Sequence, residues 1–504
     1  MSTENDHSKF LKPLKWLAVA FGIKLILYLI FILPDNNPRR KFSGCFIRSA
    51  DHNEYIRPID NLIDKGTFVL DGDTQPYAGR LPGLFFPYAL FRILFSDAVS
   101  HALLGIFILG LSLLASYTLG LLLFDLIKKR WAFICGFAFL NFIPFFWHFD
   151  WSLHTNSLGV SATVFFAYFF LKYLKGNNDR HLFYSGFMLT WIFFLRGFTL
   201  VFIPACILFL LFFLYKNGRS VKQIFYSLLI FLIPLFVFES AWVTRNYISL
   251  HKFIPLQTSF VPGSDTKNSE YSPKMITKSS MMQVRKLIFA WGGDNTWYFK
   301  NADMAWFTRE HSDIISGFNF DPNIFFEGFT PDSLDALKWT ILYSYNEDLS
   351  KASQDSVENV ISTTANRYYE KFVTNKKSYF YFYAPIKRFN TYLLKNVTQD
   401  WPGPPFNNSN IIQKGFKLIS LLQYFIFLLP VILFPVFFFR FKIKGKGFNF
   451  FTLLYLLLLC NIIPFVTIIY MSHYSYFLFG YLFNFILLVF MINFILEKRK
   501  NTVG

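Results

Sequence analysis

The chain has 504 residues, of which 54% are hydrophobic and only 16% are charged. Soluble globular proteins carry about 25% charged residues, so this composition excludes an ordinary soluble protein and indicates a chain solvated by lipid. The formal net charge of +18 suggests nucleic-acid binding, but the placement of the basic residues, given below, excludes that class.

Apolar runs long enough to cross a bilayer recur along the chain, and a membrane helix needs roughly 20 such residues. We predict about ten spans, at 16–34, 99–127, 131–149, 157–174, 182–199, 200–215, 223–241, 416–439, 450–470 and 475–496. The first is predicted to be a retained helix, because no small-residue cleavage site follows it. Lys24 within it is interpreted as a snorkelling lysine, with a functional role as the alternative.

Basic residues occupy alternate gaps between the predicted spans. These gaps contain Lys9, Lys12, Lys15; Lys128, Lys129, Arg130; Lys172, Lys175, Arg180; Lys216, Arg219, Lys222; Arg440, Lys442, Lys444, Lys446; and Lys498, Arg499, Lys500. Short basic loops on alternate sides are typical of cytoplasmic loops. The charge pattern therefore predicts both termini on the cytoplasmic side.

The same rule resolves an ambiguous stretch in the middle of the chain. The loops at 172–181 and 216–222 both have cytoplasmic character, so the residues between them must cross the membrane twice. This predicts a tight helical pair at 182–215 that turns near Arg196 and Gly197.

Two long segments fall on the opposite side by this topology. We predict an N-terminal membrane module at 1–241 with an outer loop at about 35–98, a mixed outer domain at 242–415, and C-terminal membrane helices at 416–504. Within the outer domain, residues 366–395 interleave aromatic and basic residues. They suit either a helix at headgroup level or a soluble cap packed on its own core.

Ionisable residues at the outer ends of spans are the candidate functional groups, because they are costly near hydrocarbon. Asp51 and Glu54 in the first outer loop are three apart and would share a helix face. Arg80 begins an Arg-Leu-Pro-Gly sequence before the second span, and Arg245 lies in Trp-Val-Thr-Arg-Asn-Tyr at the outer end of the seventh.

These three features, in this order and on one side of the membrane, resemble the GT-C glycosyltransferases. The most similar branch is the dolichyl-phosphate-mannose–protein mannosyltransferase-like family, which includes the bacterial lipid A aminoarabinose transferases. The likeness in topology extends over nearly the whole chain. It implies an all-α polytopic membrane fold and inverting transfer of a sugar from a polyprenyl-phosphate-linked donor.

The resemblance also implies roles for particular residues. It places Asp51 at the reacting centre with Glu54 nearby, where a carboxylate can take the acceptor proton. Arginine binds phosphate oxygens through a planar fork of donors. Arg245 is the first candidate for the donor phosphate, followed by Arg80 and Arg196.

Each residue also has a purely structural interpretation. Asp51 could cap a helix, Arg245 could anchor a helix end to headgroups, Arg80 could pair with an acid of its own loop, and Arg196 could snorkel. The sequence departs from the family at Asn156, where an acid is expected. It departs again at His473, which precedes Tyr474 where the family often has Arg-Tyr. A histidine can still donate to phosphate, so His473 and Tyr474 are further candidates for binding the donor phosphate.

Cofactors and partners follow from these expectations. The only candidate cofactor is a divalent metal ion, held by His148, Asp150 and His154, and ordinary interfacial residues are the alternative. The expected partners are a lipid-linked sugar, a lipid, glycan or protein acceptor, and the bilayer of a bacterial inner membrane. A transporter or lipid flippase is the alternative function, although the ionisable residues gather at one face rather than at mid-membrane.

Overall fold

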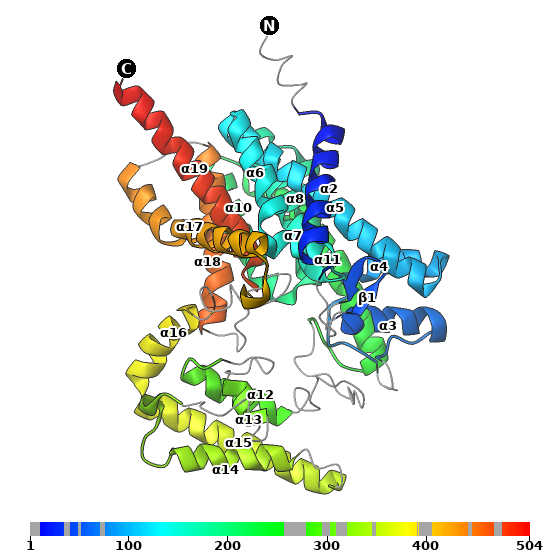
Figure 1. The fold of residues 1–504 in the computed structure, drawn as a ribbon, viewed down its shortest axis with the longest axis vertical. Helices are drawn as coiled ribbons and strands as arrows, with labels where there is room; N and C mark the ends of the chain where they lie inside the picture. The colour runs from blue at the N-terminus through cyan, green and yellow to red at the C-terminus, as the bar shows by residue number, and fades with distance from the viewer. Residues whose placement is uncertain are drawn as a thin grey trace.

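The computed structural model describes residues 11–34, 41–48, 52–70, 76–256, 279–294, 303–308, 320–344, 349–390, 392, 406–441, 446–467 and 476–503. Within these residues the chain is an all-α polytopic membrane protein whose helices form a bundle. The start of α2 and the end of α19 lie at one end of the bundle, and the outer segments lie at the other (Figure 1). This agrees with the prediction that both termini share one side.

Eight described helices are long and apolar enough to cross a membrane. They are α2 (Pro13–Phe31), α5 (Asp97–Ile127), α8 (Thr155–Gly176), η1 with α10 (Gly197–Val201 and Phe202–Lys216), α11 (Val221–Leu250), α17 (Ile411–Phe441), α18 (Lys446–Thr467) and α19 (Leu478–Val503). The remaining two predicted spans are helical but shorter, so the count of ten is not reached by length alone.

The predicted span at 131–149 is broken in two. α6 (Arg130–Phe142) and α7 (Pro144–Asp150) are separated at Ile143, which has an extended backbone (φ −78°, ψ 121°). A proline disfavours the helical conformation of the residue before it, so Pro144 ends α6 and begins α7. The break brings Asp150 to the end of a short helix next to α8.

The predicted turn at Arg196 and Gly197 within 182–215 is confirmed, but the helices on its two sides pack mainly against other helices rather than tightly against each other. α9 (Asp179–Leu195) ends where Arg196 leaves the helical region (φ −146°, ψ 89°), and η1 restarts at Gly197 before α10. α9 packs against α8 and α11. Arg196 is therefore the turning residue between two antiparallel helices.

The first outer segment is a small layer against the bundle. It contains a two-stranded antiparallel sheet, β1 (Lys41–Ser43) and β2 (Phe46–Arg48), then α3 (His52–Lys65) and α4 (Phe85–Leu94). Buried apolar side chains of α3, including Ile56 and Ile59, join a core with Tyr88, Leu104 and Ile108.

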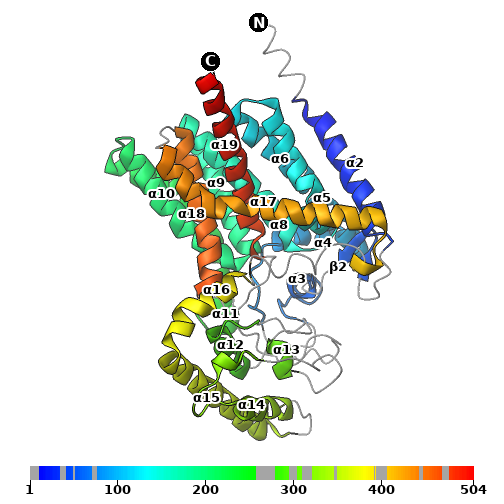
Figure 2. The ribbon, with the colours of Figure 1, turned by 60° about the vertical axis from the view of Figure 1, so that its left-hand side comes forward.

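The outer domain has its own core. Its elements are α12 (Ser279–Ala290), α13 (Asp303–Thr308), η2 (Pro322–Ile324), α14 (Pro331–Tyr343), α15 (Lys351–Asn375), the π-helix η3 (Tyr379–Tyr383) and α16 (Ala384–Asn390); a further short 3₁₀ turn, η5 (Phe406–Asn408), precedes α17. The domain was expected to be mixed, but its described residues contain helices and one isolated bridge, Phe326 to Phe329. It lies below the bundle in Figure 2, joined to α18 through α16.

The two interpretations of residues 366–395 each apply to part of the segment. Tyr368 and Phe372 of α15 are buried in the core of the outer domain, as a soluble cap requires. Tyr381, Phe382 and Ile386, nearer to α18, are 61%, 72% and 66% exposed. A helix at headgroup level remains a prediction for this second part.

α17 differs in direction from the other long helices. Its first part runs crosswise to α19 in both views (Figures 1 and 2). Its polar residues Gln413 and Lys417 are only 4% exposed, whereas Ile412 and Leu418 are 67% and 56% exposed. The apolar face therefore points away from the protein, as expected of a helix in contact with lipid.

Candidate active site

Arg196 is buried at the turn between α9 and η1. Its side chain is held by α8, because one terminal nitrogen donates to the Asn156 side-chain oxygen and lies 2.9 Å from Nδ1 of His154. The residue is 7% exposed, so the expectation that it snorkels is wrong. Both partners are neutral in this arrangement, since His154 Nδ1 also accepts the Asn156 backbone N–H at 3.1 Å.

The charge of Arg196 has no carboxylate partner among the described residues. Its ε N–H also has no hydrogen-bond partner there. Asn156, which stands where the family resemblance led us to expect an acid, is neutral and leaves the charge of the arginine uncompensated at this contact. An anion that reached Arg196 would meet an uncompensated cation.

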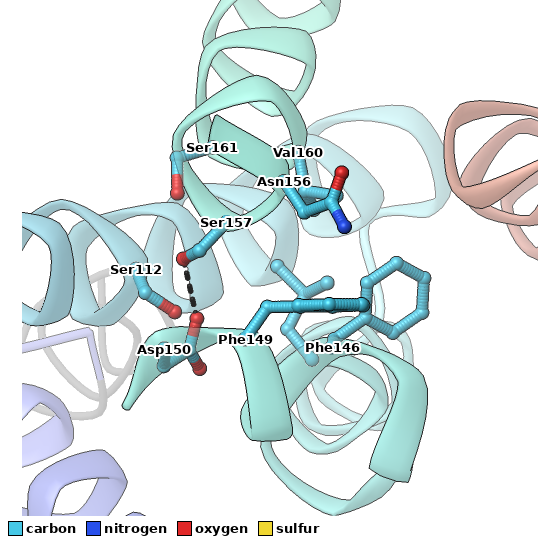
Figure 3. A pocket seen from close by; sticks show the side chains of 9 residues that line it. Ser112, Phe146, Phe149, Asp150, Asn156, Ser157, Val160 and Ser161 are labelled. Atoms are coloured by element: carbon cyan, nitrogen blue, oxygen red, sulfur yellow. Dashed lines mark hydrogen bonds between the residues drawn. The ribbon is translucent and has the colours of Figure 1, made fainter. Parts of the chain in front are cut away.

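A polar network lies beside this arginine, inside the bundle. Lys24 of α2 forms an ion pair with Asp150, and donates to Ser112 Oγ at 2.9 Å. Ser157 donates to the other Asp150 oxygen at 2.6 Å, as Figure 3 shows. Lys24 is 0% exposed, so its interpretation as a snorkelling lysine is wrong.

This network borders a small enclosed void of about 10 Å³. Asn156, Ser157 and Ser161 of α8 face it from one side, and Phe146 and Phe149 of α7 from the other (Figure 3). A void of this size and polarity holds about one water molecule. It is not a substrate pocket.

The first outer segment is anchored to the residues that precede α8. The backbone N–H of Ile47 donates to the Trp151 carbonyl at 2.8 Å, and that of Leu153 donates to the Ile47 carbonyl at 2.9 Å. His52 Nδ1 donates to the Leu153 carbonyl at 3.2 Å. Both flanks of residues 49–51 therefore lie on the strand-like segment 151–154. Asp51 itself lies outside the described residues.

Glu54 and Arg80 form an ion pair at 2.6 Å, with side chains 43% and 28% exposed. The guanidinium of Arg80 also lies 5.4 Å from the ring centre of Tyr55. The structure thus brings together two of the predicted site residues, and it bears out the structural interpretation of Arg80 as the partner of an acid from its own loop. Arg80 still presents a partly exposed face.

Arg245 binds backbone oxygens of the first outer segment. Its terminal nitrogens donate to the carbonyls of Tyr77 at 2.7 Å and Phe68 at 3.1 Å, and to the Asn246 side chain at 2.8 Å. Its guanidinium also lies 4.6 Å from the ring centre of Phe68. These contacts connect Phe68 and Tyr77 to the outer end of α11.

Gly83 connects this loop to α9. Its N–H donates to the Phe194 carbonyl at 3.1 Å, and its carbonyl accepts the Trp191 indole N–H at 3.1 Å. A Cβ at this position would overlap the Phe194 backbone. Gly83, the last residue of the Arg-Leu-Pro-Gly sequence that begins at Arg80, therefore contacts α9 two residues before Arg196.

Residues 82–242, which include Gly83 and the helices from α4 into α11, match the family model described as dolichyl-phosphate-mannose-protein mannosyltransferase. This segment is a GT-C-type glycosyltransferase domain. No curated protein matches the chain significantly. With the helices of the bundle, the match makes the chain a multi-pass membrane glycosyltransferase.

The GT-C domain contains Gly83, Asp150, Asn156 and Arg196. Glu54, Arg80 and Arg245 lie just outside the matched range and contact it or its flanks. His473 and Tyr474 lie outside the described residues. The nearest described residue, Tyr476, packs on Phe198 of η1 at 5.0 Å between ring centres.

His148, Asp150 and His154, the candidate metal ligands, do not form a cluster. Among the described residues no group of three His, Cys, Asp or Glu side chains could hold a metal ion. Asp150 instead binds Lys24 and Ser157, and His154 is hydrogen-bonded to Asn156 and Arg196. In this region the sequence did not predict the pairing of Lys24 with Asp150 or the hydrogen bond from Ser157. A lysine inside an apolar span was the available signal, because such a charge needs a buried partner.

Proposed function

We propose that this protein transfers a sugar from a polyprenyl-phosphate-linked donor to an acceptor on the outer face of the membrane, with inversion. The acceptor oxygen would attack the anomeric carbon as the bond to the carrier phosphate breaks. The acceptor proton would pass to Asp51, and the negative charge would remain on the polyprenyl phosphate. The proposal covers a lipid, glycan or protein acceptor at a bacterial inner membrane.

The observation that carries this proposal is a buried arginine that no carboxylate of the described residues neutralises. We assign the donor phosphate to Arg196, because its neighbours His154 and Asn156 are neutral and its ε N–H is unused within the described residues. A phosphate oxygen would complete its coordination with charge-assisted hydrogen bonds. Arg80, joined to the same region through Gly83, is a second contact for the phosphate.

Arg245, the first candidate from the sequence for the donor phosphate, is proposed to have mainly a structural role. Three of its N–H groups already bind oxygen atoms of the protein, so a phosphate would have to compete with them or use the remaining donors. Its main proposed contribution is to hold the outer loop in place over the site. Direct contact with the phosphate is the secondary proposal.

The assignment of Asp51 as the base is supported by its flanks. Ile47 and His52, which lie on either side of Asp51 in the sequence, both bind the segment that leads into Asn156, a side-chain partner of Arg196. Glu54, one turn further along α3, would act beside Asp51 or orient the acceptor. The family match favours this transferase over the alternative of a transporter or flippase.

The test is transfer in vitro with purified full-length protein and a labelled polyprenyl-phosphate sugar. Asp51→Asn should leave the protein folded and abolish transfer, whereas full activity in that variant would refute the proposed base. Mass spectrometry of envelope lipids and glycoproteins from cells with and without the gene would identify the acceptor. Movement of the labelled lipid across vesicles without covalent change would instead support the flippase.

A further inference from the structure

A cavity opens at the end of the bundle that carries the two termini, far along α8 and α9 from the candidate active site. The turn from α5 to α6 and the turn from α8 to α9 border an open surface cavity of about 390 Å³. Its lining includes Asp125, Lys128, Lys172, Lys175, Asn178 and His181. By the distribution of basic loops, this is the predicted cytoplasmic face.

The charges around the cavity do not balance. Asp125 is shared by two lysines, at 2.6 Å from Lys172 and 3.3 Å from Lys128. The third lysine, Lys175, donates to the Asp125 backbone carbonyl at 2.7 Å, so it is not paired with the Asp125 carboxylate. Three cations thus surround one carboxylate, which leaves a formal excess of two positive charges over the lining residues.

Two further features favour an anion at this place. α9 begins at the cavity with Asn178 as its cap, so the positive end of a 17-residue helix adds to the lysines. His181 contributes a buried Nδ1 that has no hydrogen-bond partner among the described residues. Asp179, which begins α9, is not one of the lining residues.

We propose that this cavity binds a phosphate-class anion. Lysine ammonium groups are point-charge partners for phosphate, and the helix ends place them where lipid headgroups meet water. The anion could be the headgroup of an anionic phospholipid or free phosphate, and both have the chemistry that the lining recognises. The site is separate from the proposed transfer reaction, because it lies at the opposite ends of α8 and α9 from Asn156 and Arg196.

The experiment uses the full chain in detergent micelles and native mass spectrometry. Micelles are supplemented with phosphatidylglycerol, with phosphatidylcholine, or with inorganic phosphate alone. We expect phosphatidylglycerol to be retained in preference to phosphatidylcholine. Lys172→Gln with Lys175→Gln should reduce retention more than ten-fold, since each lysine near an anionic surface corresponds to about a five-fold change, or ~1 kcal/mol.

The matched control removes two lysines from the same face, with Lys216→Gln and Lys222→Gln, both exposed. It should retain the lipid as the native protein does. Asp125→Asn should bind the anion at least as tightly, because it removes the competing carboxylate, whereas a purely structural Asp125 predicts only lower thermal stability. If the double lysine variant fails to fold, Lys128→Gln, 68% exposed, should still weaken retention by about five-fold.

The three supplements also distinguish a lipid headgroup from free phosphate as the bound anion. Retention of phosphatidylglycerol that phosphate does not displace identifies a lipid site. Stabilisation by phosphate alone, lost in the lysine variants, identifies a site for the free ion. Equal retention of both lipids by the native protein and the lysine variants, with no effect of phosphate, would overturn the proposal.

Discussion

Lys24 on α2 and Asp150 at the end of α7 form an ion pair inside the bundle, with side chains 0% and 3% exposed. The pair joins the first membrane helix to the residues that lead into α8. Ser112 and Ser157 supply further hydrogen bonds to it at 2.9 and 2.6 Å. Removing one partner of such a buried pair is costly, because the charge that is left is neither paired nor in contact with water.

Lys24→Met should therefore lower the stability of the protein strongly. Loss of one partner of a buried pair costs about 3–5 kcal/mol, so we expect a large drop in the thermal unfolding midpoint in detergent. Lys15→Met, an exposed site on the same helix, is the control and should change little. Adding Asp150→Asn to Lys24→Met should recover part of the loss, and strictly additive losses would contradict the direct pairing.

Substitution of Arg196 should affect the reaction more than the fold. A hydrogen bond to a charged group contributes about 1.5–3 kcal/mol, so Arg196→Lys is expected to lower kcat/KM for the lipid-linked donor by roughly ten- to a hundred-fold. Arg245→Lys is the comparison, and it should reduce thermal stability as well, because it releases the Phe68 and Tyr77 carbonyls. If Arg245→Lys alone raised KM for the donor, Arg245 would be the phosphate ligand.

Gly83→Ala should displace the outer loop from α9. The added methyl group would overlap the Phe194 backbone, and overpacking of this kind costs about 1–3 kcal/mol. We expect lower thermal stability and reduced transfer together. Gly110→Ala on α5 is the matched control, because no atom lies within 4 Å of its added Cβ. Equal effects at the two glycines would show that the loop contact is not the cause.

Stability should depend on pH through His52. Burial, followed by the charge of His101, lowers the pKa of His52 from 6.5 to about 3. The neutral ring thus stabilises the fold fully above pH 6.5, and this contribution is lost as the pH falls from 6.5 towards 3, by up to about 1.4 kcal/mol per pH unit. Thermal unfolding of His52→Gln between pH 7 and 5 should show a shallower decline than the native protein. His251→Gln, at an exposed position, should leave the slope unchanged.

Glu54→Gln distinguishes a catalytic carboxylate from a loop-stabilising one. The Glu54–Arg80 pair is partly exposed, so its loss should change stability by no more than about 1 kcal/mol. If Glu54 assists Asp51, transfer should fall at least ten-fold while the unfolding midpoint stays nearly constant. Glu54→Asp is the comparison, because it keeps a carboxylate but shortens its reach to Arg80. Equal activity losses in Glu54→Gln and Glu54→Asp would assign the effect to the ion pair rather than to the carboxylate.

The membrane architecture was largely predictable from the sequence. Apolar runs and the alternation of basic loops indicate the helices, the shared side of the termini and the turn at Arg196, because hydrophobic length and charge act locally along the chain. The break at Pro144 is also a local effect, although it was missed. The resemblance that led to the GT-C family was likewise carried by short, ordered motifs.

The pairings between distant residues were decided only by the tertiary structure. Lys24 lies 126 residues from Asp150, and Arg245 lies 168 residues from Tyr77, so no spacing in the sequence relates them. The same lysine or arginine side chain can reach a headgroup or a buried oxygen, and the choice depends on which helices pack beside it. Sequence alone determined that this chain crosses the membrane, whereas packing decided which of its charges are paired: Lys24 meets Asp150, and Arg196 meets only neutral side chains among the described residues.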